Sequence, residues 1–257
     1  MLELFLAELR RTWIQFKRYP FEAVGGIFIM TSVFYGLFLG ARYVAGTGFG
    51  MGDRFEAVVV GYVLWSLVLF ILSTIAIELQ SEAQTGTLEQ VFLSPFRAWI
   101  IFATRAIASL TIQAILIAVI LGIISLLTGT RLNFSPSLLP PLITTLMGAY
   151  GISFMAGSLS LLFKRVQQLL TIFQFGLLFV LSTPLETWDG PLKLLGQALP
   201  MTSGAGLLRD VMARDLRLDS QALVLSLLNG AVYLSLGLLI FQWCERQAKK
   251  RGKLSGY

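Results

Sequence analysis

Residues 57–77 read AVVVGYVLWSLVLFILSTIAI and contain no charged side chain. A helix needs roughly 20 apolar residues to cross a hydrocarbon layer about 30 Å thick, so this stretch predicts a membrane span. It is apolar on every side, whereas the strands of a membrane barrel alternate in polarity over about 10 residues. The stretch therefore predicts an all-α integral membrane protein.

Stretches of the same kind recur along the chain. Of the 257 residues, 56% are hydrophobic and 13% are charged, and the mean hydropathy is +0.76, far above that of a soluble domain. The charge-free apolar runs are residues 23–41, 57–77, 106–128, 138–163, 166–185 and 222–244. We therefore predict six transmembrane helices in a single domain that covers residues 1–257.

The 20 Lys and Arg residues are divided unevenly between the two ends of these spans. One side carries most of them, namely Arg10, Arg11, Lys17, Arg18, Arg97, Arg105, Lys164, Arg165, Arg246, Lys249, Lys250, Arg251 and Lys253. The other side carries Arg42, Arg54, Arg131, Lys193, Arg209, Arg214 and Arg217. Because cytoplasmic segments are enriched in Lys and Arg, we expect a multi-pass protein of the bacterial plasma membrane with both termini in the cytoplasm. On this interpretation the net charge of +6 directs topology and attracts lipid head groups, not nucleic acid.

The first 20 residues form a separate amphipathic element that Pro20 ends. Its apolar residues follow helical spacing: Leu2, Phe5, Leu6, Leu9, Trp13 and Phe16. We predict an interface helix over residues 1–20 that lies on the inner membrane surface and places Trp13 at the level of the lipid head groups. A solvated segment ahead of the first span is the alternative.

Residue types that most catalytic sites require are scarce. The chain contains no His, which excludes a Ser-His-Asp triad and any histidine metal site. Its one cysteine, Cys244, has no partner for an intrachain disulfide, and we expect it to serve packing. Glu186 and Asp189 form a loose acidic pair without a nucleophile or further metal ligands, which disfavours a membrane-bound enzyme. We expect neither catalytic residues nor a metal site.

A short helix signature lies between the second and third apolar runs, in the segment Glu82-Ala83-Gln84-Thr85-Gly86-Thr87-Leu88-Glu89-Gln90-Val91-Phe92-Leu93-Ser94-Pro95. Gly86 can break the incoming helix, and Thr87 can cap a new helix together with Gln90 three positions later. Pro95 marks the point at which the new helix should stop. The pattern predicts about two helical turns.

This short helix over residues 81–95 has one apolar face. Leu88, Val91 and Phe92 fall at positions i, i+3 and i+4, so they lie on the same side. A helix of this length is unstable in water unless that side docks onto something. The spacing therefore predicts a contact with a partner.

The connection over residues 186–221 differs from the short turns elsewhere. It holds two moderately apolar pieces, residues 191–199 and 205–212, that are too short to span a membrane. Pro200 should end the first piece, and residues 201–204 should form a turn into the second. Backbone breaks at membrane depth persist only where protein or a water-filled cavity surrounds them, so we predict an extracytoplasmic re-entrant hairpin that caps a pathway. A surface hairpin is the alternative.

Few polar residues lie within the predicted spans. Glu22, Glu78 and Arg105 are near the cytoplasmic ends, where we expect them to stabilise helix ends or to pair with one another. The candidate pathway-lining residues are Trp65, Gln113, Phe173, Gln174, Phe175 and Asn229. An apolar and aromatic lining suits an amphiphilic molecule better than an ion, whereas packing between helices is the alternative role for each residue.

Residues 82–95, with their Glu-x-x-x-Gly-Thr-Leu-Glu core and closing proline, resemble the coupling-helix region of the type-2 permeases of ATP-binding-cassette (ABC) exporters. The daunorubicin-exporter-like group is the most similar. Residues 183–186, 199–202 and 207–210 resemble the loop that follows the fifth span in this family. The resemblance covers nearly the whole chain.

The resemblance implies the transmembrane permease subunit of an ATP-driven exporter for an amphiphilic drug, lipid or glycolipid. A separate nucleotide-binding ATPase subunit would use ATP and Mg, and two permease copies, expected as a homodimer, would form the pathway. This chain has no Gly-x-x-x-x-Gly-Lys-Ser/Thr segment, so we do not expect it to hydrolyse ATP. The residues implied in coupling are Glu82, Gly86, Thr87, Leu88, Glu89, Val91, Phe92 and Pro95.

In this interpretation the ATPase subunit grips the side of Leu88, Val91 and Phe92, while Glu82 and Glu89 contact its basic residues. A polysaccharide-exporting ABC permease is the main alternative within the family. A carrier or channel without ATP should show polar rings or matching broken helices, and we find no such internal repeat. A scaffold protein would have no use for the capped apolar helix. The sequence does not identify the substrate.

Overall fold

The structure is a computed structural model that describes residues 2–45, 53–130, 132–162, 167–185, 188, 190 and 196–250. These residues are predominantly helical and include no strand. Five helices have the length and composition to cross a membrane: Pro20–Gly40, Phe55–Glu82, Ala98–Thr128, Pro136–Leu159 and Ser220–Lys250. They coincide with five of the six predicted spans, so the prediction of an all-helical, multi-pass membrane protein is confirmed.

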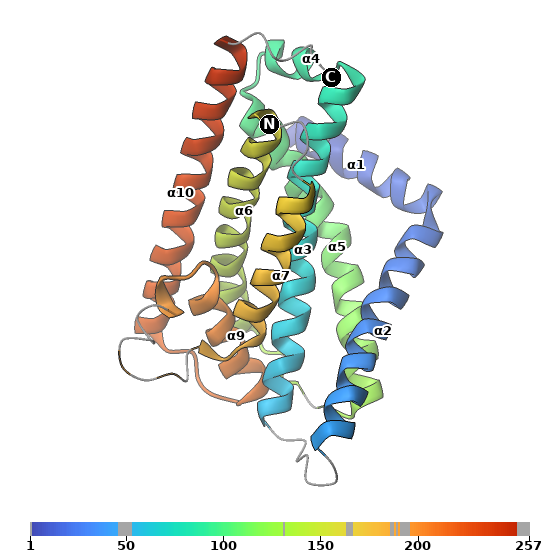
Figure 1. Ribbon diagram of the computed structural model, residues 1–257, viewed down its shortest axis with the longest axis vertical. Coiled ribbons are helices and arrows are strands. Elements are labelled where there is room, and N and C mark those ends of the chain that lie inside the picture. The colour runs from blue at the N-terminus through green and yellow to red at the C-terminus, as the bar shows by residue number, and fades with distance from the viewer. Residues whose placement is uncertain are drawn as a thin grey trace.

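The long helices form an elongated bundle with α3 in the middle (Figure 1). In chain order the helices are α1 (Leu2–Arg18), α2 (Pro20–Ala45), α3 (Asp53–Thr85), α4 (Leu88–Leu93), α5 (Ala98–Thr128), α6 (Leu139–Leu162), α7 (Gln167–Ser182), α9 (Thr202–Ala213) and α10 (Ser220–Lys250). A 3-10 turn, η2 (Pro136–Leu138), leads into α6. Most side chains of α3 are buried because α5, α6, α7 and α9 pack around it.

The region predicted as the fifth span, residues 166–185, corresponds to α7. Its 16 described residues extend about 24 Å, which is less than the hydrocarbon thickness. The helix packs along α3: Gly61 lies against the backbone of Leu181, and the Trp65 indole N–H donates to the Gln174 carbonyl at 2.9 Å. The described length therefore does not by itself establish a sixth span.

Small residues allow α6 and α10 to approach closely. A Cβ atom added to Gly237 would lie 2.1 Å from the Gly151 carbonyl oxygen, and one added to Gly230 would lie 2.6 Å from the Thr144 carbonyl oxygen. The hydroxyls of Thr144 and Ser226 are 2.6 Å apart in the same contact. This arrangement follows the rule that small residues let helix backbones meet in membranes.

The second short helix of the late connection is α9, and it is buried in the bundle. Its start differs from the prediction, because residues 202–204 are already helical and the turn lies just before them. Met201 makes that turn with φ 65°, and the Thr202 hydroxyl donates to the Leu199 carbonyl at 2.8 Å. Residues 196–198 are helical, whereas residues 191–195 of the first predicted piece lie outside the described part.

Arg209 links α9 to the end of α7 by hydrogen bonds. Its side chain is 1% exposed, and its guanidinium donates to the Leu181 carbonyl at 2.6 Å and to the Thr183 carbonyl at 3.4 Å. Carbonyls at the end of a helix lack partners within the helix, so a buried arginine can satisfy them. Arg209 therefore joins α9 to α7. Its position in the sequence indicated only a contribution to membrane topology.

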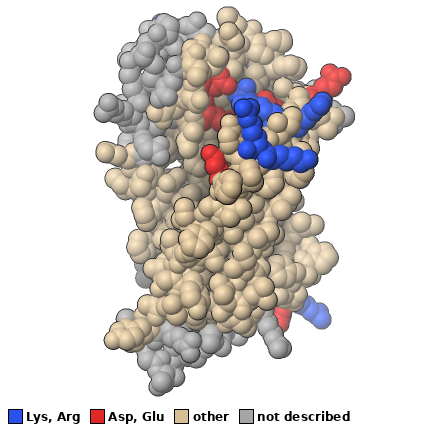
Figure 2. All heavy atoms as spheres, turned by 90° about the vertical axis from the view of Figure 1, so that its right-hand side faces the viewer, with Lys and Arg blue, Asp and Glu red and all other residues tan. Residues whose placement is uncertain are grey.

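Helix α1, helix α4 and the last turns of α10 lie at the same end of the bundle (Figure 1). Figure 2 shows acidic and basic side chains gathered near this end of one face, a few at the opposite end, and an uncharged band between them. Such a band is typical of a surface that faces lipid. The predicted amphipathic helix over residues 1–20 is confirmed as α1, while its position on a membrane surface stays a prediction.

Candidate functional site

The predicted coupling segment begins where α3 ends. Gly86 has φ 73°, a left-handed conformation that favours glycine, and the Thr87 amide donates to the Glu82 carbonyl at 3.0 Å. This hydrogen bond, together with the left-handed glycine, is the usual way in which a helix terminates at glycine. The predicted break at Gly86 is confirmed, and it turns the chain directly into α4.

The predicted cap at Thr87 is wrong in its detail. Thr87 occupies the N-cap position of α4, but its side chain makes no capping hydrogen bond. Its hydroxyl instead donates to the carboxylate of Glu82 and lies 2.8 Å from the Thr85 hydroxyl. A hydrogen bond to a charged carboxylate is stronger than the neutral bond that a cap would accept from a backbone amide, which explains why the Thr87 side chain points back to α3. The predicted end before Pro95 is confirmed, since α4 ends at Leu93.

The two faces of α4 differ in what they contact. Val91 packs against a buried cluster that includes Leu79, Ala98 and Phe102, so this side of α4 is turned to the bundle. Leu93, two positions later, is 84% exposed. Positions two apart on a helix point in widely different directions. Val91 is therefore an anchor of α4, and Leu93 is an exposed apolar side chain on another face.

Three predicted coupling residues belong to α4, but only their backbone is described. They are Leu88, Glu89 and Phe92, whose side chains lie outside the described part of the structure. The expected contact of these side chains with a partner stays a prediction. The short segment before them is described at Glu82, Gly86 and Thr87, and these residues shape the turn that presents α4.

Arg105 of α5 connects the start of α4 to α1. Its Nη1 atom lies 2.6 Å from Glu82 Oε1, and its Nε atom lies 3.0 Å from Glu8 Oε1. The three side chains are only 13–16% exposed, so water screens them weakly. Glu8 also accepts from Arg11 at 3.4 Å. The Glu8–Arg105–Glu82 cluster therefore ties α1, α5 and the end of α3 together.

This cluster changes two sequence expectations. Arg105 forms ion pairs as expected, but its partners are Glu8 and Glu82, and not Glu22 or Glu78. The carboxylate of Glu82, expected to face basic residues of a partner, is already bound to Arg105 and Thr87. A contact between Glu82 and a partner stays a prediction.

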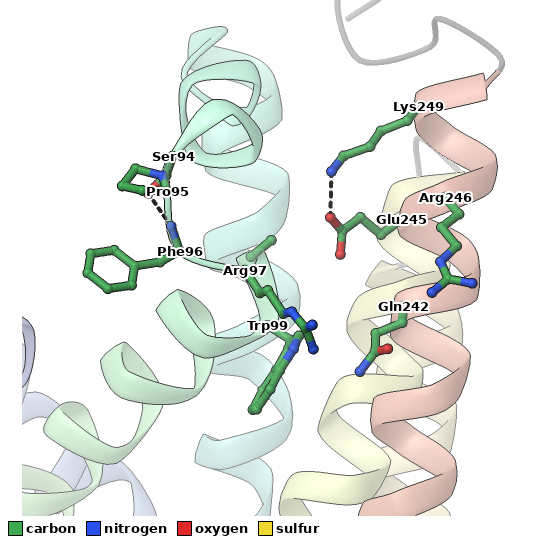
Figure 3. Close-up of a pocket in the computed structure, with 10 residues that line it drawn as sticks. Ser94, Pro95, Phe96, Arg97, Trp99, Gln242, Glu245, Arg246 and Lys249 are labelled. Carbon is green, nitrogen blue, oxygen red and sulfur yellow. Dashed lines mark hydrogen bonds and ion pairs between the residues drawn. The ribbon is translucent and has the colours of Figure 1, made fainter. Parts of the chain in front are cut away.

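A groove of about 390 Å³ lies between the α4–α5 connection and the end of α10 (Figure 3). One wall is residues 94–99, and the other carries Gln242, Glu245, Arg246 and Lys249. Lys249 and Glu245 are paired at 2.7 Å. The buried indole nitrogen of Trp99 has no hydrogen-bond partner among the described residues. The groove offers a polar, concave surface beside α4.

Three candidate pathway residues make contacts within the bundle, and whether they line a pathway stays a prediction. Trp65 is only 7% exposed, and its indole lies at a tilt to the ring of Tyr62 with ring centres 5.5 Å apart. Asn229 donates to the carbonyls of Gln197 at 3.0 Å and Leu199 at 3.2 Å, so it holds the late connection. Gln174 supplies the backbone acceptor for Trp65. Trp65 and Asn229 therefore contribute to packing in the bundle, while the contact of Gln174 is made by its backbone.

The other candidates do border open space. Phe173 lines an apolar cavity of about 510 Å³ between α6, α7 and α10, together with Leu159, Leu170 and Tyr233. Phe175 is exposed on α7. Gln113 of α5 lines two adjoining cavities beside α2. These three positions are compatible with a pathway or with a contact to a second copy.

Sequence reasoning missed two residues of this site. Leu93 breaks the apolar spacing of α4, and only its exposed position makes it a candidate for a partner contact. Glu8 belongs to α1, far from Arg105 in sequence, and its role depends on how α1 packs on α5. Glu8 lies outside the apolar face of α1, so helical spacing carried no signal for its role.

A protein-family model described as ABC-2 family transporter protein matches residues 47–241. The matched region extends from the connection before α3 to within α10, and therefore includes α4, the Arg105 pair with Glu82 and the late connection. A comparison with curated protein sequences found no significant match.

Proposed function

The chain belongs to the ABC-2 family of transporter proteins, whose members are membrane subunits of ABC transporters, and we propose that it forms the export pathway of an ATP-driven exporter. The family implies association with an ATP-binding subunit, which in our proposal is a separate chain. The substrate that we propose is an amphiphilic molecule. Support comes from the apolar and aromatic surfaces of the bundle and from the cavities beside α2 and α7.

The single observation that carries the proposal is the way α4 is held. Val91 anchors one side of the helix in the bundle, while Leu93 is left exposed on another side. Gly86 and the Glu82–Thr87 hydrogen bond determine the direction in which α4 leaves α3. A short helix that is rigidly joined to a long one can pass a push from a partner into the bundle.

We propose that α4 is the coupling helix and that Arg105 transmits the motion of α4 to α1 and α5. When ATP closes the two ATPase subunits, a displacement of α4 moves the end of α3, to which Arg105 binds through Glu82. Arg105 also binds Glu8, so α1 and α5 move with α3 as one unit. Well-connected charged networks of low exposure favour two discrete arrangements over gradual deformation.

We propose six crossings, with α7 as the fifth and both termini in the cytoplasm. α7 lies along α3, and its last residues meet Gly61 near the beginning of α3. Helix α1 and the end of α10 lie at one end of the bundle, which requires an even number of crossings between them (Figure 1). The basic residues of that end support a cytoplasmic location in the plasma membrane.

The proposed complex contains two copies of this chain and two ATPase subunits. In each copy, α9 and residues 196–201 form part of a re-entrant cap at the outer end. Burial of α9 among α3, α6 and α10 supports this role over that of a surface hairpin. The polysaccharide-export alternative has no specific observation in its favour.

The experiment is co-purification from the native membrane in mild detergent, followed by mass spectrometry and an ATPase assay. We expect a P-loop ATPase subunit with the wild-type chain and a much weaker recovery with Leu93→Asp, which changes an exposed apolar side chain of α4. Burial of one leucine side chain contributes about 1.5–3 kcal/mol, which corresponds to roughly ten-fold to hundred-fold in affinity. Recovery of the wild-type chain alone under several detergents would overturn the proposal.

A further inference from the structure

Two adjoining cavities run along the inner side of α2, between this helix and the pair α3 and α5. The first, of about 640 Å³, is bordered by α1, α2, α3 and α5, and the second, of about 190 Å³, continues along α2, α3 and α5. Both are lined by Glu22, Ala23, Phe70, Ser73, Gln113 and Leu116, so they form one continuous groove. The combined volume lies in the range of ligand sites for small molecules.

The two ends of this groove have different chemistry. The end beside α1 is polar, with Thr12, Gln15, Glu22, Thr74, Glu78 and Ser109 among its lining residues. The other end is mainly apolar and includes Gly26, Ile27, Met30, Leu69 and Ile120. From Glu22 to Met30 the axis of α2 rises about 12 Å. A ligand that fits both ends therefore needs a polar head and an apolar tail.

The polar end is acidic. Glu22 and Glu78 line it, and no described lining residue of either cavity is Lys or Arg. One carboxylate oxygen of Glu78 is buried and has no hydrogen-bond partner among the described residues. A buried carboxylate oxygen without a donor is costly, and a cationic ligand group would satisfy it.

The basic residues close to this end in sequence are engaged elsewhere. Arg105 binds Glu8 and Glu82, whereas Lys17 lies 5.2 Å from the Trp13 ring centre and Arg18 lies 5.6 Å from that of Tyr19. No ion pair links any of these cations to Glu22 or Glu78 among the described residues. None of these cations therefore forms a direct ion pair with the two carboxylates that line the acidic end.

We propose that this groove binds a single-chain amphiphile with a cationic head group, held by Glu78 and Glu22, with its tail between α2 and the α3–α5 pair. Gln113 lies between the two ends and can bond to the linkage between head and tail. A head group that carries a phosphate would meet two carboxylates, which disfavours anionic and phosphate-bearing lipids. That the bound amphiphile is the exported substrate rests on the proposed function, whereas the binding itself does not.

The test is photo-crosslinking in vesicles that contain this chain and no ATPase subunit. The probe is a dodecyl chain with a diazirine near its end and a primary ammonium head, whose N–H groups can donate to Glu78, and the matched probe has the same chain with a neutral hydroxyl head. We expect the cationic probe to label residues of α2, α3 or α5 that line the apolar end, as mapped by mass spectrometry. Labelling should be about ten-fold weaker for the neutral probe, as expected when a charged hydrogen-bond partner is lost.

The matched variants are Glu78→Gln and Glu3→Gln. Glu78→Gln keeps the size of the side chain and removes its charge, and it should reduce labelling by the cationic probe about ten-fold. Glu3 lies on the exposed side of α1 and lines neither cavity, so Glu3→Gln should label like the wild type. Tryptophan fluorescence and elution volume check that both variants are folded.

Two results would overturn the inference. One is equal labelling by the cationic and neutral probes, and the other is undiminished labelling of a folded Glu78→Gln variant. Vesicles with and without phosphatidylethanolamine distinguish the free amphiphile from a membrane lipid, because a lipid occupant would compete with the probe. Since no ATPase subunit is present, these failures would leave the co-purification result, and with it the proposed function, unaffected.

Discussion

At the scale of single residues, Arg105 holds more of the site together than any other described side chain. We expect Arg105→Met to lower stability by about 3 kcal/mol, because it leaves the weakly exposed carboxylates of Glu8 and Glu82 without their partner. Thermal denaturation of the purified protein measures the loss. The double variant Arg105→Met/Glu82→Gln should recover part of it, since one unpaired charge is removed.

The control for this prediction is Arg97→Met. Arg97 is exposed and is a member of no described ion pair, so its replacement should change stability by less than about 0.5 kcal/mol. Equal thermal midpoints for the Arg97 and Arg105 variants would show that the Glu8–Arg105–Glu82 cluster does not support the bundle.

Gly151 decides how closely α6 and α10 pack. A Cβ atom at this position would lie 2.3 Å from the Tyr233 carbonyl group, so Gly151→Ala should separate the helices and cost about 1–3 kcal/mol. Gly36 of α2 has nothing within 4 Å of such an atom, and Gly36→Ala should leave stability unchanged or slightly higher. Thermal denaturation of both variants tests the contact, and it is refuted if Gly151→Ala is as stable as Gly36→Ala.

At the scale of elements, substitutions on the two faces of α4 should have different effects, one on folding and the other on binding of the ATPase subunit. Val91→Asp places a charge against the cluster of Leu79, Ala98 and Phe102, so it should lower the thermal midpoint of the isolated chain. Leu93→Asp changes an exposed side chain, so it should leave that midpoint unchanged. In our proposal Leu93→Asp should nevertheless reduce recovery of the ATPase subunit at least ten-fold.

Both measurements on the two α4 variants are needed, because a misfolded chain would also lose its partner. We expect that the Leu93→Asp chain is stable but fails to bind the ATPase subunit, and that the Val91→Asp chain is destabilised. A stable Leu93→Asp chain that binds the ATPase subunit normally would move the docking surface away from the exposed face of α4.

At the scale of the whole molecule, the exposed faces of α7 and α10 differ in composition. Exposed residues of α7 include Ile172, Phe173, Phe175 and Phe179, whereas those of α10 include Val224, Leu228, Val232 and Leu239. Aromatic residues are enriched in protein interfaces, and aliphatic residues suit lipid. We therefore expect the second copy to pack on α7 and lipid to contact α10.

Cysteine cross-linking tests this arrangement, since the chain has a single cysteine to replace. In a Cys244→Ser background, single cysteines at Ile172, Phe175 and Phe179 lie on one side of α7. A disulfide requires Cα atoms within about 7 Å, so at least one of the three should give a dimer on mild oxidation in membranes. Cysteines at Val224, Leu228 and Val232 of α10 should not. Dimers from α10 alone would reverse the assignment.

The helices and their ends follow from local patterns, which is why so much of this fold can be predicted from the chain. Apolar runs of about 20 residues specify membrane helices regardless of their neighbours. The left-handed backbone at Gly86 and the stop before Pro95 are likewise local properties of these two residues. Within the predicted segment 81–95 the short helix therefore forms at Leu88–Leu93, whereas residues 81–85 continue α3.

The partners of individual side chains depend on contacts between distant segments, and local patterns do not contain them. Helical spacing predicts that Val91 lies with Leu88 and Phe92 on the side of α4 that contacts a partner. In the structure, Val91 packs against the bundle. Trp65 was expected to line a pathway, and the approach of α7 buried it. In both cases an apolar side chain suits a core and a binding surface equally well.

The sequence by itself determined that this protein is a helical membrane protein with a short helix between its second and third spans. Its family is also recognisable from the sequence. The lengths of the apolar runs and the positions of glycine and proline determine local backbone structure, and they do so without contacts from distant segments. Only the tertiary structure decided that Arg105 joins Glu8 to Glu82, that Leu93 is exposed on α4, and that Glu22 and Glu78 border one groove. These are relations between helices, and their energies depend on distance and burial, which packing alone sets.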